Sequence, residues 1–162
     1  MRIMSKIVLL SALILFAQTG LCADGSFVFL KPTTFDQSVK LTVSGKSRQY
    51  YVVDRESRLT VTISGPSELK IMSRLELHSQ TATPDYSFEV TNEETKKTKT
   101  VHHSSKYSEK SEFADKSDSF LGVLRSKVID IPSGTHTYVV HVPESSSERV
   151  FVRLSQKTNE FT

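Results

Sequence analysis

The chain has 162 residues, with 21 Lys and Arg against 18 Asp and Glu, and it contains a single cysteine. This length suits one domain with its own core. Without the leader described next, which contributes Arg2 and Lys6, 19 basic residues face 18 acidic ones. A balance this close to neutral argues against nucleic acid as a partner and against strong attraction to an anionic membrane.

The first 23 residues have the order of a secretory signal peptide. Arg2 and Lys6 form a basic start, an apolar run follows over 7–17, and small and polar residues come before the first acidic residue. An apolar run of about 11 residues is shorter than the roughly 20 that a membrane-spanning helix needs. We predict cleavage after Ala23, a single domain over 24–162 and a periplasmic or secreted location.

Cys22 leaves an alternative open. In a bacterial lipoprotein a cysteine at this place carries the lipid, usually after Gly, Ala or Ser, whereas Leu21 precedes it here. Lipidation would turn a soluble protein into a membrane-anchored one. With cleavage after Ala23 the exported chain has no cysteine, so it must be held together by its core without disulfides.

After the leader, apolar and polar residues alternate with period two, and no long amphipathic helix is visible. Such alternation is typical of antiparallel strands with one wet face. It predicts strands at 27–29, 39–43, 49–53 and 59–63. Gly65-Pro66 is a turn signal that should end the last of these.

The middle of the chain continues the pattern. A strand is predicted over 69–77, where Ser73 interrupts the apolar positions and indicates a bulge or a switch between sheets. Residues 86–90 and 96–102 should form a hairpin around the polar reversal at 92–95. The second strand of this hairpin is rich in lysine, which suits an exposed sheet edge.

The stretch 104–119 mixes Ser, Lys, Glu and Asp with few apolar residues. One interpretation is a solvated, mobile loop between strands. The other is a binding loop in which Tyr107 and Phe113 contact a partner, since long loops in compact domains are often functional or disordered.

The last third predicts further strands at 121–131, 138–142 and 150–154, with Pro132-Ser133-Gly134 as a stop after the first. Many short strands at even spacing with turn signals between them indicate a sandwich or a barrel. The fold class expected from the residues is therefore all-β.

The segment 131–142 reads IPSGTHTYVVHV and resembles the late-strand entry of fibronectin type III and related immunoglobulin-like domains. The resemblance implies an antiparallel immunoglobulin-like β-sandwich of about 8–9 strands, with Tyr138 packed inward and its hydroxyl reaching back to upstream backbone. The segment is also similar to glycogen-binding modules, which implies a carbohydrate-binding accessory domain. Those modules stack sugars on tryptophan, and this chain has none.

No catalytic or metal pattern stands out. His102 and His103 are adjacent, and His136 and His141 are five apart, so each pair points to opposite faces of a strand. A zinc site needs three or four convergent ligands. No G-x-S-x-G elbow and no phosphate-binding glycine loop occurs. We predict no metal, no cofactor and no enzymatic activity.

Tyr50 and Tyr51, beside Arg48, are the most interesting candidates for a contact surface. On a strand one ring faces the core and the other can lie on the surface, where Tyr offers a rigid ring and a polar tip. The alternative, that both rings are buried at a sheet corner, stays open.

These observations favour a non-enzymatic exported binding or scaffold module of the bacterial cell envelope. We expect it to contact another envelope protein, with Arg48, Tyr50, Tyr51, Tyr107 and Phe113 as candidate contacts. The alternative is a carbohydrate-binding accessory domain. A second alternative is an enzyme or inhibitor whose site only the fold assembles.

Overall fold

The computed structural model describes residues 25–158, which form strands and connecting loops without a helix. The predicted signal peptide, its cleavage after Ala23 and the alternative at Cys22 lie outside these residues. All strand pairs are antiparallel, which confirms the all-β prediction. The strands are β1 Phe27–Leu30, β2 Thr34–Phe35, β3 Ser38–Val43, β4 Lys46–Val53, β5 Leu59–Leu77, β6 Asp85–Asn92, β7 Thr98–Ser104, β8 Ser111–Phe113, β9 Phe120–Leu121, β10 Arg125–His141 and β11 Val150–Lys157.

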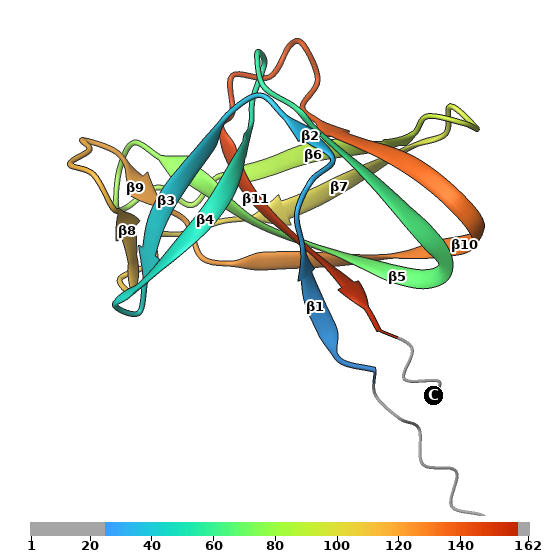
Figure 1. Cartoon of the computed structure of the whole chain (residues 1–162). Helices are drawn as coiled ribbons and strands as arrows, with labels where there is room; N and C mark the ends of the chain where they lie inside the picture. The colour runs from blue at the N-terminus through green and yellow to red at the C-terminus, as the bar shows by residue number, and fades with distance from the viewer. Residues whose placement is uncertain (1–24, 159–162) are drawn as a thin grey trace, which may run out of the picture.

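The two longest strands, β5 and β10, pair with each other and pass through both layers of a curled sandwich. In the first layer they lie beside β6, β7 and β2. In the second layer β11 pairs with β5 on one side. On its other side β11 pairs with β4 and, further along, with β1, and β3 and β8 lie beyond β4. Figure 1 shows β5 and β10 curving round together where the layers meet.

Both long strands bend where Gly65 lies opposite Gly134. A Cβ on Gly65 would collide with the carbonyl oxygen of Pro132, so only glycine lets the two backbones come this close. The predicted turns at Gly65-Pro66 and at Pro132–Gly134 are therefore wrong. The two sites face each other across the ladder, so the strands bend together and pairing resumes beyond the bend, with a register shift between Ile131 and Gly134.

The inner faces of the two layers form the main core, and its members follow the predicted alternation. It contains Tyr51, Val53, Leu59, Val61, Ile63, Leu69, Ile71, Leu75, Leu77, Tyr86, Phe88, Val90, Val101, Ile129, Ile131, Tyr138, Val140, Val142, Val150, Val152 and Leu154. Ser73 lies among them fully buried, and its hydroxyl is 2.8 Å from that of Tyr86. The predicted bulge or sheet switch at Ser73 is wrong, because this hydrogen bond satisfies the polar atom and the pairing with β11 runs through Ser73 without a register shift. The pairing with β10 starts at Ser73, opposite Arg125.

A second cluster lies on the outer face of the second layer and consists of Leu41, Tyr50, Val52, Leu121 and Phe151. The segment 104–124 covers it. Within that segment β8 pairs with β3, β9 pairs with β5, and Tyr107 bridges to Gly122. Part of the polar stretch 104–119 is thus paired to the sheet, because it shields apolar side chains that the alternation leaves on the outside.

The β6–β7 hairpin has the strands and the sheet edge that the sequence predicts. The Asn92 side chain accepts hydrogen bonds from the backbone N–H groups of Glu94 and Thr95, both at 3.0 Å, which fixes the reversal. Among residues 25–158 there is no helix long and apolar enough to cross a membrane.

Tyr138 packs inward, as the resemblance to immunoglobulin-like domains implies. The structure records no hydrogen bond of its hydroxyl within the described residues. The resemblance therefore extends to an antiparallel sandwich, and the implied tie between the tyrosine and upstream backbone is not seen.

Candidate functional site

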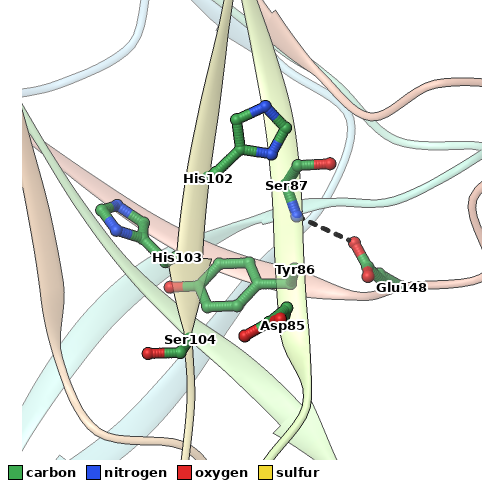
Figure 2. Close-up of a pocket in the computed structure, with 7 residues that line it drawn as sticks. All are labelled: Asp85, Tyr86, Ser87, His102, His103, Ser104 and Glu148. Atoms are coloured by element: carbon green, nitrogen blue, oxygen red, sulfur yellow. Dashed lines mark hydrogen bonds between the residues drawn. The ribbon is translucent and has the colours of Figure 1, made fainter.

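An open hollow of about 450 Å³ lies at the end of the first layer where β6 begins and β7 ends. The loop between β10 and β11 closes one side of it with Glu148 (Figure 2). The residues that line it are Asp85, Tyr86, Ser87, His102, His103, Ser104 and Glu148. The lining is thus rich in hydroxyl, imidazole and carboxylate groups, which supply both donors and acceptors of hydrogen bonds.

The register of the hairpin brings these groups together. Ser87 lies opposite His102, and Tyr86 lies opposite His103. Because successive side chains of a strand alternate in direction, Ser87 and His102 share the outer face of the layer. Figure 2 shows the two imidazoles on opposite sides of β7, with His102 on the side of Ser87.

Glu148 is held against β6 by backbone and hydroxyl donors. Its Oε2 accepts hydrogen bonds from the Ser87 backbone N–H at 3.3 Å and from the Ser146 hydroxyl at 3.4 Å. The pairing of β10 with β6 ends at Glu89, so the Ser87 N–H has no strand partner on that side and the carboxylate takes its place. The loop is thereby fixed with a carboxylate at the rim of the hollow.

The polar outer face continues beyond the hollow. The His141 ring has its Nδ1 3.6 Å from Glu89 Oε2 and its Nε2 3.1 Å from the Thr91 hydroxyl. Thr91 in turn is 2.8 Å from the Thr98 hydroxyl on β7. A strip of hydroxyl, imidazole and carboxylate groups therefore adjoins the hollow across β7, β6 and β10. No group of three or more potential metal ligands occurs among residues 25–158.

His103 faces the interior, where its ring lies 5.6 Å from that of Tyr86 and 6.2 Å from that of Phe88. Its Nε2 is buried and has no hydrogen-bond partner within the described chain. Burial, followed by the positive charges of Arg125 and Lys127, lowers the pKa of His103 below its ordinary value of 6.5. The ring is thus held neutral at neutral pH.

This histidine predicts acid sensitivity of the fold. The unfolded chain takes up the proton at a higher pH than the folded one does, so stability falls as the pH drops below about 6.5. We expect His103→Gln to lose less stability than the wild type between about pH 7.5 and 5.0. Urea unfolding of both proteins at each pH measures the difference. Equal losses would assign the acid sensitivity to other groups.

None of the five residues predicted as partner contacts lines this hollow. Tyr50 and Tyr51 are 3% and 8% exposed, so the expectation of a surface tyrosine is wrong and the alternative, that both are buried, is confirmed. The reason is that both faces of β4 are covered, one by the first layer and the other by segment 104–124. Arg48 is half-buried on the same strand.

Tyr107 and Phe113 are half-buried and turn toward their own sheet. Tyr107 packs edge-on against Phe120 at 5.8 Å, and Phe113 packs edge-on against Phe151 at 5.4 Å. The structure therefore places both rings as anchors of segment 104–124, and their contact with a partner stays a prediction.

Sequence reasoning missed the hollow although it predicted the hairpin. The adjacent His102 and His103 were the available signal, since one of any adjacent pair on an edge strand faces outward. The third contributor, Glu148, comes from a loop 61 residues beyond Ser87. No local pattern links these two positions.

Comparisons with known proteins concern the fold. No protein-family model and no curated protein matches the sequence. Among solved structures, the chain is similar to the Agl-KA catalytic domain, with a TM-score of 0.52 and 12% identity over 84% of this chain. That match covers 28% of the Agl-KA chain, so the likeness is to a part of it.

Two further structures are similar at lower TM-scores. The first is the K1 cleaved adhesin domain of Lys-gingipain from Porphyromonas gingivalis, at 0.47 and 11% identity over 83% of this chain and 99% of that one. The second is a carbohydrate-binding module from Cellvibrio mixtus lichenase 5A in complex with cellotriose, at 0.45 and 9% identity over 80% and 92%. At 12% identity the similarity to part of the Agl-KA chain concerns the fold alone.

Proposed function

We propose that this chain is an exported, non-catalytic carbohydrate-binding module whose ligand occupies the hollow of Figure 2 and the polar strip beside it. The observation that carries the proposal is the convergence of Ser87, His102 and Glu148 from three segments on one open hollow. A sugar presents several neighbouring hydroxyls, each both donor and acceptor. A site with a few well-placed hydroxyl, imidazole and carboxylate groups is complementary to them.

The openness of the site favours binding over catalysis. The hollow lies on a sheet edge where water has free access, whereas catalytic sites commonly exclude water and enclose the reacting atoms. A chain-like ligand can lie across such a surface without threading into a closed cavity. Export itself rests on the leader sequence.

The test uses the protein recovered after export, with its N-terminus read by mass spectrometry. Affinity electrophoresis against neutral polysaccharides identifies a ligand, and calorimetry measures its Kd. We expect Glu148→Gln to weaken binding by about tenfold or more, because a hydrogen bond to a charged group contributes on the order of 1.5–3 kcal/mol. His102→Ala should weaken binding by about two- to tenfold, because an ordinary hydrogen bond contributes about 0.5–1.5 kcal/mol. The amide introduced by Glu148→Gln keeps an oxygen that accepts from the Ser87 N–H, so the loop should stay in place.

Asp130→Asn is the matched control, since this exposed carboxylate lies on β10 in the second layer. It should bind like the wild type. Unchanged affinity of the His102 and Glu148 variants would overturn the proposed site.

A protein partner in the cell envelope is the second candidate. The exposed apolar strand β1 favours it, with Val28 at 52% and Phe29 at 59% exposure. Failure to bind any glycan, together with one specific protein recovered by crosslinking in cells, would support this candidate.

A further inference from the structure

A second hollow lies in the other layer, where the neighbours of β11 change. Residues 150–152 of β11 pair with β4, and residues 154–157 pair with β1. Arg153 stands between these two sets, and Figure 1 shows β4 and β1 beside different parts of β11. A hollow of about 370 Å³ opens in this fork and is lined by Phe29, Leu30, Lys31, Phe35, Gln49, Tyr51, Arg153 and Leu154.

The Arg153 guanidinium lies over an aromatic ring in this fork. Its Cζ lies 3.8 Å from the centre of the Phe29 ring and 5.6 Å from that of Tyr50. The structure gives its N–H groups no hydrogen-bond or carboxylate partner within residues 25–158. A guanidinium stacked on an aromatic ring loses little further freedom on binding, and its planar edge fits a carboxylate with two parallel hydrogen bonds.

The charge of the fork is one-sided. Arg153 and the exposed Lys31 supply two cations, Gln49 supplies an amide, and none of the lining residues carries a carboxylate. Glu68, which is outside this lining, is paired with Lys157 at 2.6 Å. The hollow therefore has an uncompensated positive potential that favours an anionic ligand.

The rest of the lining is aromatic and accessible. Phe29 is 59% exposed and Phe35 is 37% exposed, so both offer apolar surface to a ligand beside the two cations. An exposed apolar patch that is rimmed by polar residues commonly marks an interaction site. A ligand with a carboxylate next to an apolar ring face would match both features at once.

We propose that this fork binds the carboxylate of an acidic polysaccharide, with Arg153 as the bidentate partner and Lys31 as a second cation. The preference for a carboxylate rests on the fork alone. The assignment of that carboxylate to a sugar chain rests on the proposed function. The site is separate from the hollow between β6 and β7, which lies in the other layer.

Polygalacturonate is the probe, in affinity electrophoresis and calorimetry at low and at physiological salt. We expect it to bind the wild type, and Arg153→Met to weaken binding by about tenfold or more. Arg153→Lys keeps the charge but loses the planar edge, so it should recover only part of the affinity. Circular dichroism and the Tm confirm that each variant is folded.

Further binding measurements distinguish this proposal from other anionic ligands and from the proposed function. Lys97→Met removes an exposed cation that lies outside both hollows, and it should bind polygalacturonate like the wild type. Loss of neutral-glycan binding by His102→Ala tests the proposed function separately. Unchanged binding of polygalacturonate by Arg153→Met would overturn the fork site. Equal or tighter binding of dextran sulfate, of poly-glutamate or of anionic phospholipid vesicles, with the same dependence on Arg153, would overturn the assignment to a carboxylated sugar.

Discussion

Replacing Phe88 with alanine should lower the free energy of unfolding by about 3–5 kcal/mol. Phe88 is fully buried between the two layers and is among the largest such side chains of the described chain. Its removal takes apolar surface out of the core and leaves a cavity that the surrounding strands can only partly fill. Urea unfolding, followed by tyrosine fluorescence and circular dichroism, measures the loss.

Phe29→Ala is the matched control, because the same side chain is removed from a position that is 59% exposed. It should cost less than about 1 kcal/mol, since little apolar area returns to water. Similar losses for the two variants would contradict the location of the core. A small loss for Phe29 would also agree with a role of this ring in binding.

Replacing Tyr50 with phenylalanine should lower the free energy of unfolding by about 1–3 kcal/mol, although only one oxygen is removed. Arg74 is 5% exposed, and its Nε–H donates to the Tyr50 hydroxyl at 3.2 Å. Its Nη1 donates to the Gly122 carbonyl at 3.1 Å, which fastens segment 104–124 to the sheet. Without the hydroxyl, a charged donor remains buried and unsatisfied.

Tyr51→Phe is the control for this effect, since Tyr51 is the neighbouring buried tyrosine and its hydroxyl bonds no described residue. We expect a change within about 0.5 kcal/mol. Hydrogen exchange should also show faster opening of 104–124 in the Tyr50 variant alone. Equal stability of the two variants would mean that the contact between Arg74 and Tyr50 contributes little.

The buried Arg74 also explains why segment 104–124 is ordered in spite of its polar composition. The alternation of their strands turns Tyr50, Val52 and Phe151 toward the outer face of the second layer, where they would be exposed without this segment. Covering these side chains removes apolar surface from water, and the carbonyl of Gly122 satisfies the cation. Phe113 and Leu121 complete the cover.

Local alternation carried most of the information that the sequence held. It predicted the inward residues of β5, β6, β10 and β11, the reversal at 92–95 and the lysine-rich edge at β7, because the side-chain direction of a strand repeats every two residues. For Tyr50 and Tyr51 it allowed two alternatives, and the one in which both rings are buried is confirmed. These features depend on neighbours along the chain.

The long-range features depended on the tertiary structure. Gly65-Pro66 and Pro132–Gly134 each have the composition of a turn, and only their position opposite each other across the ladder turns them into one shared bend. Glu148 can accept a hydrogen bond from the Ser87 N–H because the pairing of β6 with β10 ends at Glu89. Such sites are set by register between distant strands, which composition and periodicity do not encode.

The fork at Arg153 has the same origin. Arg153 lies between the apolar residues Val152 and Leu154, which is the ordinary alternation of a strand and indicates no site. Phe29, which packs against Arg153, lies more than a hundred residues earlier in the chain. The sequence by itself determined an all-β chain with a leader-like start and the faces of its strands. Only the tertiary structure decided which outward side chains meet, because those meetings depend on which strands lie side by side and where each pairing ends.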